Sequence, residues 1–504
     1  MLDHDVDAEA ILNEVGNFGT YQIIHSILYF FPVTFTSSFI LSMAFTAAVP
    51  DFKCYSDDVY ANVFNSTTMN WSPCHCKEDW FVFNQNVYKS TIASEWNLVC
   101  NKSHWLPIAQ SMVFGGVLVG GFSFGVIAST FGRKLACVLS ISILGICGTL
   151  SAFVSNFYLY LVFQFLAGIG ESGLFQTSHV LTVENVGKNH RVFVAVLLNM
   201  FLALGFCNLA GTAWWLRDWK LIVIATAVPP LITLVYFPFL DESFRWLLSK
   251  KRYEEAEIIL RKIARVNGRT FPENLSQFKI IHLEESHAST KEDSFWDLLY
   301  SPSLRFRSIV LYYSWFVASL LYYGITLHST ALYGDVYLNF FLASLAEFPG
   351  NIFSYVGMKT IGRKWTVCLS YSFMGIACLV QTVDLENYYL TIAMTFIGKM
   401  CGASAFGTIY LYTIELFPTS IRTSAVGVCS FWSYLASILT PYVAKLALYY
   451  GLSNVDIVFG ISALVVGLLI LSFPETKHYK IPETIKEAES FGRTKSLDKA
   501  PLLV

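Results

Sequence analysis

The sequence predicts an all-α membrane protein with twelve transmembrane helices in two pseudo-symmetric six-helix halves. Three observations support this fold class: an apolar composition, twelve long apolar stretches, and motifs that return after about 230 residues. Of the 504 residues, 54% are hydrophobic and 14% are charged, whereas soluble domains carry about 25% charged residues. The composition therefore excludes a soluble multidomain protein and a disordered chain.

The balance of charges limits the possible partners. The chain holds 34 Lys and Arg residues against 36 Asp and Glu residues, so there is no net basic field to attract nucleic acid. We expect the lipid bilayer to be its surroundings and no nucleic acid to be bound.

Twelve stretches are long enough to cross a membrane, because a spanning helix needs about 20 mostly apolar residues. They are 23–48, 105–128, 135–155, 157–181, 192–214, 220–240, 306–327, 336–357, 365–383, 388–412, 424–448 and 453–473. Their length and lack of alternation argue against a transmembrane barrel.

The charges of the short loops predict the orientation. The loops of one side carry Arg133, Lys134, Lys188, Arg191, Lys359, Arg363, Lys364 and Arg422. The short loops of the other side carry only Arg217 and Lys220. The positive-inside rule places the first set in the cytoplasm, and twelve spans then place both termini there. No cleavable signal peptide is expected, because the first basic residue is Lys53.

The polar segment 51–104 falls outside the cell in this orientation. It holds four cysteines, which suit an oxidising space, and three glycosylation sequons. The cysteines are Cys54, Cys74, Cys76 and Cys100, and the sequons begin at Asn65, Asn70 and Asn101. A bond between Cys74 and Cys76 is sterically poor, which leaves two possible pairings. The other seven cysteines lie in spans, where we expect them to pack as small apolar side chains.

The segment between spans six and seven falls inside. Its stretch RYEEAEIILRKIARV has helical periodicity, so we expect cytoplasmic amphipathic helices and an unused sequon at Asn274. The predicted parts are a cytoplasmic N-terminus (1–22), an N-terminal half (23–240), a linker (241–305), a C-terminal half (306–473) and a cytoplasmic tail (474–504).

Three motifs repeat at matching places in the two halves. Gly132-Arg133-Lys134 returns as Gly362-Arg363-Lys364, 230 residues later. Glu184 and Arg191 return as Glu415 and Arg422, and Asp241-Glu242-Ser243 is echoed by Pro474-Glu475-Thr476. This is the parallel-repeat plan of the major facilitator superfamily, in which two halves rock around a central site.

The repeated charges suggest a gate at the cytoplasmic ends of the helices. Ion pairs there would latch the gate in one state and break in the other. The alternative is that these charges only set the topology. The candidate gating residues are Arg133, Lys134, Glu184, Arg191, Arg363, Lys364, Glu415 and Arg422.

Several motifs identify the chain as similar to a known family. AAVPDFKC (47–54) and STIASEWNLVC (90–100) frame the large first exofacial loop, and DESFRWLLSKKRYEEAEIILRKIARVNG (241–268) matches a central cytoplasmic signature. ASLAEFPG (343–350) and YTIELFPTSIR (412–422) match the eighth span and the junction of spans ten and eleven. Over nearly its whole length, the chain resembles the organic cation, anion and carnitine (zwitterion) transporter family within that superfamily.

The chain departs from the family pattern in three places. Ser129 stands where the family usually has Asp before the first Gly-Arg-Lys, and Phe244 stands where Pro is usual. The exofacial loop holds four cysteines instead of six. The missing carboxylate at Ser129 puts gating of the N-terminal half in doubt.

Charges inside spans cost about 2.5–3.5 kcal/mol each, so they are functional candidates. Glu347 and Lys399 fall where the resembled family keeps an acid and a base, while Glu171 follows no family pattern. The alternative is a structural ion pair between helices that never touches substrate. The resemblance also assigns aromatic cavity positions to Trp315 and Tyr322 in span seven.

Further candidates lie in spans four, five and eleven. Phe175 and His179 align with cavity positions of the family, and Asn199 is a weaker candidate. Cation carriers of the family have Asp in span eleven and anion or carnitine carriers have Arg, but Tyr434 aligns there. Because a tyrosine is neutral, it does not set the sign of the substrate's charge.

The resemblance implies a secondary-active or facilitative plasma-membrane carrier of small organic ions, working by alternating access, with cations or zwitterions slightly favoured. Two alternatives remain, a sugar-porter-like carrier of neutral solutes and a ligand sensor that does not transport. We expect no enzymatic activity, cofactor or metal, because the sequence shows no phosphate loop, nucleophile elbow or metal-ligand cluster at working spacing.

Overall fold

All twelve predicted spans are helical in the structure, a computed structural model. It describes residues 11–54, 81–271, 302–330, 332, 334–383, 388–418, 421–477 and 487–488. The first half contains α2 (Thr20–Leu41), α3 (Met43–Thr46), α5 (Trp105–Phe131), α6 (Arg133–Ser151), α7 (Phe157–Glu184), α8 (Arg191–Leu216) and α9 (Trp219–Thr233). The second contains α14 (Pro302–Ser329), α15 (Val336–Leu345), α16 (Glu347–Thr360), α17 (Arg363–Gln381), α18 (Tyr388–Leu416), α19 (Arg422–Tyr450) and α20 (Leu452–Ile470).

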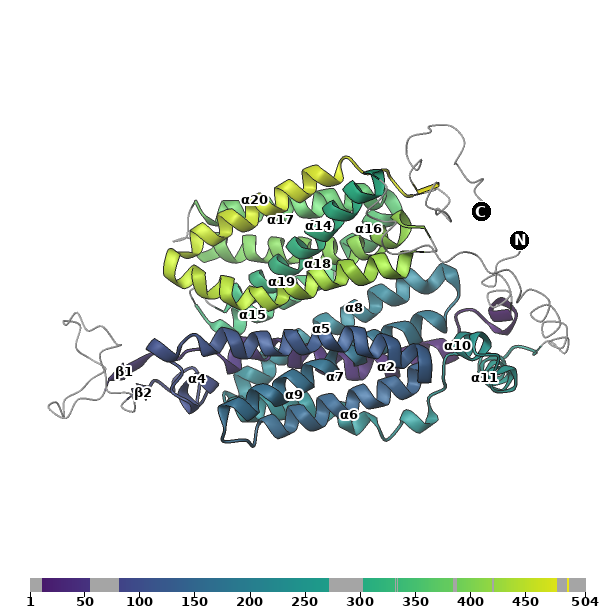
Figure 1. Ribbon diagram of the computed structural model, residues 1–504, viewed down its shortest axis with the longest axis horizontal. Coiled ribbons are helices and arrows are strands. Elements are labelled where there is room, and N and C mark those ends of the chain that lie inside the picture. Colours follow the sequence, from purple (N-terminus) through teal and green to yellow (C-terminus); the bar gives the residue numbers. More distant parts are fainter. Residues whose placement is uncertain are drawn as a thin grey trace.

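The two halves form two layers that lie side by side (Figure 1). One end of the bundle, the loop end, carries the short strands β1 (Phe52–Cys54) and β2 (Phe81–Phe83), which pair antiparallel, and helix α4 (Ile92–Glu95). The opposite end, the linker end, carries α10 (Phe244–Ser249) and α11 (Tyr253–Val266). The first described residues, before α2, and the segment that follows α20 both lie on the side of the linker end (Figure 1).

Nine helices within the described ranges are individually long and apolar enough to span a membrane. The other three predicted spans deviate for visible reasons. Helix α9 is short and contains Pro229 and Pro230, and α17 holds several polar residues in addition to the two basic residues at its start. The eighth span is divided into α15 and α16 because Pro349 has no N–H to donate to the carbonyl four residues earlier.

The two halves form matching hydrogen bonds at the linker end, as the internal repeat of the sequence suggests. Glu242 accepts from the backbone N–H groups of Arg133 and Lys134, at 3.0 and 3.1 Å, where α6 begins. Glu475 accepts from Arg363 and Lys364, at 2.9 and 3.2 Å, where α17 begins. A carboxylate thus satisfies the free N–H groups at equivalent helix starts, where the helix dipole also favours negative charge.

The linker helices pack on the first half. The side-chain amide of Asn267, just after α11, accepts from the N–H of Tyr21 at 3.0 Å and donates to Gln22 at 3.0 Å. Lys262 of α11 forms an ion pair with Asp241 at 2.6 Å. These contacts hold α11 against the start of α2, with its apolar face turned inward as the periodicity predicts.

The described part of the 51–104 segment fits an oxidised loop. Cys100 is disulfide-bonded, and Asn101 is exposed. Cys74, Cys76, Asn65, Asn70 and the side chain of Cys54 lie outside the described residues, as does Asn274 of the linker. The seven cysteines that the sequence places in spans are free.

Helices α5 and α7 approach so closely that their contact requires glycine. A Cβ atom at Gly116 would lie 2.0 Å from the carbonyl oxygen of Phe165, and one at Gly168 would lie 2.2 Å from that of Val113. Small residues at such positions let the backbones of membrane helices meet.

We predict that Gly116→Ala destabilises the protein, because the methyl group must push two helices apart, at a cost of about 1–3 kcal/mol. Gly211→Ala is the matched control, since nothing lies within 4 Å of its added Cβ. Thermal unfolding of the purified proteins in detergent should show a lower midpoint for Gly116→Ala and an unchanged or higher midpoint for Gly211→Ala. Equal midpoints would contradict this account of the packing.

Candidate functional site

Two of the three charges that the sequence places inside spans form a buried ion pair. Nζ of Lys399 on α18 lies 2.9 Å from Oε1 of Glu347 on α16, and the two side chains are 0% and 2% exposed. The hydroxyl of Tyr322 on α14 donates to the same oxygen at 2.8 Å. The lysine also donates to the backbone carbonyl of Tyr322 at 3.2 Å and lies over its ring. The three residues therefore tie together three helices of the second half.

The local sequence explains this geometry. The break that Pro349 imposes places Glu347 in the first turn of α16, where the helix dipole favours a carboxylate. Gly350 then lets α16 approach α18, because a Cβ there would lie 2.3 Å from the carbonyl oxygen of Met400. A lone charge at this depth is costly, and each member of the pair offsets the cost of the other.

A series of aromatic contacts runs from this pair to the other half. Tyr322 contacts Phe406 at a centroid distance of 5.8 Å, and Phe406 contacts Trp315 at 5.9 Å. Trp315 contacts Tyr410 at 5.7 Å, and Tyr410 contacts His179 of α7 at 6.2 Å. Trp315 is fixed in this series, because its indole N–H donates to Thr413 at 3.0 Å.

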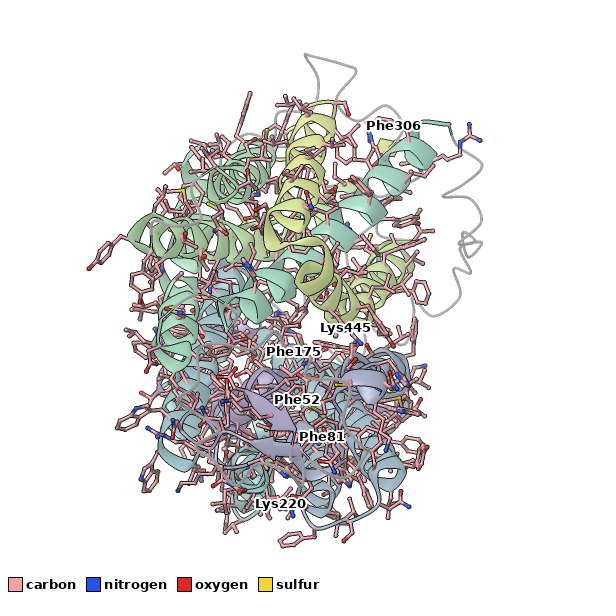
Figure 2. The ribbon with its side chains drawn as sticks, turned by 90° about the vertical axis from the view of Figure 1, so that its left-hand side faces the viewer. Phe52, Phe81, Phe175, Lys220, Phe306 and Lys445 are labelled. Carbon is pink, nitrogen blue, oxygen red and sulfur yellow. The ribbon has the colours of Figure 1, made fainter. Side chains whose placement is uncertain are left out.

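Two more of the predicted residues lie where the halves meet, one on α7 of the first half and one on α19 of the second. Phe175 stacks on His179 at a centroid distance of 6.5 Å. It lies near the boundary of the two halves (Figure 2). Tyr434 of α19 packs against α5, because a Cβ at Gly121 would lie 3.2 Å from its ring. Asn199 lies on α8 and, among the described hydrogen bonds and ring contacts, takes part in none of these.

The sequence analysis did not select three aromatic residues that the structure places here. Phe406 and Tyr410 connect Trp315 with the rest of the series, and Tyr323 lies edge-on to Tyr322 at 5.1 Å. A signal for two of them was present. Phe406 and Tyr410 follow Lys399 by seven and eleven residues, which places all three on one face of α18.

The candidate gating residues lie at the linker end. Arg133 pairs with Glu184 at 3.1 Å, and Arg363 pairs with Glu415 at 3.0 Å. The ammonium of Lys134 donates to the carbonyl of Leu240 at 2.5 Å. The two ion pairs join α6 to α7 and α17 to α18, so each lies within one half in this state.

The remaining gating candidates lie at the starts of α8, α17 and α19. The side chain of Arg422 donates to the carbonyl of Phe417 at 3.4 Å, and Arg191 begins α8. Lys364 contributes its backbone N–H to Glu475.

Hydrogen bonds between the two halves gather toward the loop end. Ser111 of α5 donates to the carbonyl of Ile438 at 2.7 Å, and Tyr337 of α15 donates to that of Val87 at 2.7 Å. Lys445 of α19 donates to the hydroxyl of Ser103 at 3.1 Å. Figure 2 looks onto this end, where Lys445 lies at the level at which the halves meet. The halves are therefore joined to each other at the loop end in this structure.

Comparison with known proteins identifies the family. A family model described as "Sugar (and other) transporter" matches residues 21–487. The human protein named solute carrier family 22 member 2 is 33% identical over 427 residues, which cover 83% of this chain and 74% of the relative. The chain belongs to the organic cation, anion and carnitine transporter family of the major facilitator superfamily. This membership confirms the resemblance that the sequence motifs indicated.

Other members of this family match over similar lengths. The Drosophila melanogaster organic cation transporter protein is 29% identical over 519 residues, 96% of this chain and 94% of the relative. The human organic cation/carnitine transporter 2 is 32% identical over 415 residues, 82% of this chain and 74% of the relative.

Solved structures confirm the fold. A proton:xylose symporter of the superfamily, bound to 6-bromo-6-deoxy-D-glucose, matches with a TM-score of 0.65 and 16% identity, over 94% of this chain and 99% of its own. The xylose transporter of E. coli in an inward open conformation matches with a TM-score of 0.60 and 18% identity, over 93% and 98%.

We predict that the Glu347–Lys399 pair behaves as one unit. Glu347→Gln or Lys399→Met alone leaves a buried charge without its partner, which costs about 3–5 kcal/mol. The double variant removes both charges and should unfold near the wild-type temperature. Thermal unfolding of the four purified proteins measures this coupling, and a double variant with the summed loss of both single variants would show that the charges are independent.

Proposed function

We propose that this protein carries small organic ions across the plasma membrane by rocking its two halves around a site between them. The observation that carries the proposal is the contact of His179 on one half with Tyr410 on the other. It connects the buried polar residues of α7 with the aromatic series and ion pair of the second half. A site built from both halves is the arrangement that alternating access requires.

The chemistry of the site suits an organic ion. The ring faces of Trp315 and Tyr434 carry partial negative charge from their π-electrons, and each cation–π contact contributes about 0.5–2 kcal/mol. Relatives named organic cation transporter protein and organic cation/carnitine transporter 2 agree with this chemistry. Cations or zwitterions are therefore the substrates that we favour.

The gating proposal follows from where the halves touch. The contacts of Ser111, Tyr337 and Lys445 close the loop end. To open that end, these three hydrogen bonds must break while the halves approach each other at the linker end. In that state, the Arg133–Glu184 and Arg363–Glu415 pairs would come into reach of the opposite half, where they could latch the gate.

The orientation and energy source complete the proposal. We infer that the linker end and both termini face the cytoplasm, because the basic residues of the short loops lie at this end. A monovalent cation moving inward along the membrane potential gains about 2.3 kcal/mol per 100 mV. Uniport along this potential, or exchange for another organic ion, supplies the driving force.

Uptake by cells that express the chain tests this function. Labelled tetraethylammonium, carnitine and p-aminohippurate are compared at fixed voltages, with surface protein measured and untransfected cells as the control. We predict saturable uptake of tetraethylammonium or carnitine, with tetraethylammonium uptake increasing at more negative voltage. Uptake of none of the three with the protein at the surface, or uptake that hexoses abolish by competition, would overturn the proposal in favour of a sensor or a sugar carrier.

A further inference from the structure

Glu171 is a membrane-buried carboxylate that the function described so far does not use. It lies near the middle of α7 (Phe157–Glu184), and its side chain is 6% exposed. Because a charge at this depth costs about 2.5–3.5 kcal/mol on insertion scales, such a residue is expected to have a partner or a function. Within the described ranges, no Lys, Arg or His forms an ion pair with it.

The face of α7 that carries Glu171 is turned toward the other half. Glu171, Phe175 and His179 follow one another at intervals of four residues and therefore lie on one side of the helix. Because His179 contacts Tyr410 of α18, this side of α7 faces the second half. Glu171 itself lies within electrostatic range of Tyr323 on α14 and Tyr434 on α19. The carboxyl group therefore belongs to the first half, whereas Tyr323 and Tyr434 belong to the second.

The two other membrane-buried charges near this region cancel each other. Lys399 lies 2.9 Å from Glu347 and over the ring of Tyr322, so its positive charge is already compensated. Tyr323 lies within electrostatic range of both Glu347 and Glu171 and contacts Tyr322. Tyr323 thus lies near both a paired acid and base and a single acidic side chain that has no ion partner among the described residues.

The neighbours of Glu171 are those that a cation prefers. Tyr323 contacts the ring of Phe114 on α5 at a centroid distance of 5.0 Å. The ring of Tyr434 meets Ser172, the residue after Glu171, at Gly121 of α5, where an added Cβ would lie 3.2 Å from the ring and 3.5 Å from the serine hydroxyl. An ammonium group at this place would exchange its water shell for a carboxylate and the faces of aromatic rings. An anion would find no such partner here, because the ammonium group of Lys399 is already paired with Glu347.

We propose that Glu171 is the counter-charge that binds the positive group of the substrate, with Tyr323 and Tyr434 as the aromatic side of the site. This assignment rests on the proposed transport function and gives it a charge class: small monovalent organic cations, with or without a remote carboxylate. The Glu347–Lys399 pair has a different role, which is to position Tyr322 and the helices around it.

The test compares Glu171→Gln with a matched control. Asp456→Asn removes another membrane-buried carboxylate, 5% exposed on α20, whose electrostatic neighbour is Cys378 of α17 in the same half. Uptake of labelled tetraethylammonium is measured for wild type and both variants at equal surface protein. We expect Glu171→Gln to raise KM for tetraethylammonium at least tenfold and Asp456→Asn to leave it unchanged.

A second variant moves the carboxylate from the first half of the site to the second. In the double variant Glu171→Gln/Tyr434→Asp, the carboxylate faces the same place from the second half, and uptake of tetraethylammonium should return. If Glu171→Gln alone fails to reach the surface, Glu171→Met, which leaves no buried amide without a hydrogen bond, is measured in its place: a KM for tetraethylammonium raised at least tenfold supports the proposal, and an unchanged KM overturns it.

The outcomes separate this inference from the proposed function. Wild-type uptake with an unchanged KM in Glu171→Gln would overturn the role of Glu171 alone and indicate a carboxyl group that stays protonated. A wild-type protein that takes up neither cation nor zwitterion would overturn the transport function itself.

Discussion

The architecture of this protein depends on the cost of placing charge in a bilayer. Glu347 and Lys399 meet that cost by pairing at 2.9 Å, and their contact holds α16 to α18. Tyr322 extends the contact to α14 through its hydroxyl and its ring. Because Pro349 interrupts the eighth span, the carboxylate stands at a helix start rather than inside a continuous helix. The second half is thereby organised around one buried, neutral group.

The cost of placing charge in a bilayer also limits which acidic side chain can meet a substrate. With Glu347 and Lys399 neutralised, Glu171 is the membrane-buried carboxylate at the boundary of the halves without an ion partner among the described residues. Aromatic rings continue from its face of α7 through Tyr410 and Trp315 to Tyr322. The halves touch through a surface that is largely aromatic and holds this acidic side chain, which suits the rocking motion and the cation site that we propose. The loop end closes over this surface by a few hydrogen bonds, which a rocking motion can break.

Much of this architecture could be predicted from the sequence, because it depends on local patterns. Apolar length predicted the twelve helices, and the repeated Gly-Arg-Lys and acidic motifs predicted the related halves. The division of the eighth span follows from Pro349, but its position at Ala346 depends on packing against α18. The pairing of Glu347 with Lys399 was an alternative that only the fold could decide, since 52 residues separate them. Glu171 was selected as a buried charge, yet its surroundings come from α14 and α19, which no pattern within α7 reveals.

The central claim is that the Glu347–Lys399 pair is a fixed structural element and that a substrate cation binds elsewhere in the same site. A cryo-electron microscopy structure of the protein with bound tetraethylammonium tests it most directly. The account predicts that the Glu347–Lys399 pair stays intact and that the ligand's nitrogen lies beside Glu171, between Tyr323 and Tyr434. A ligand seated on Glu347, with Lys399 displaced from it, would contradict the account.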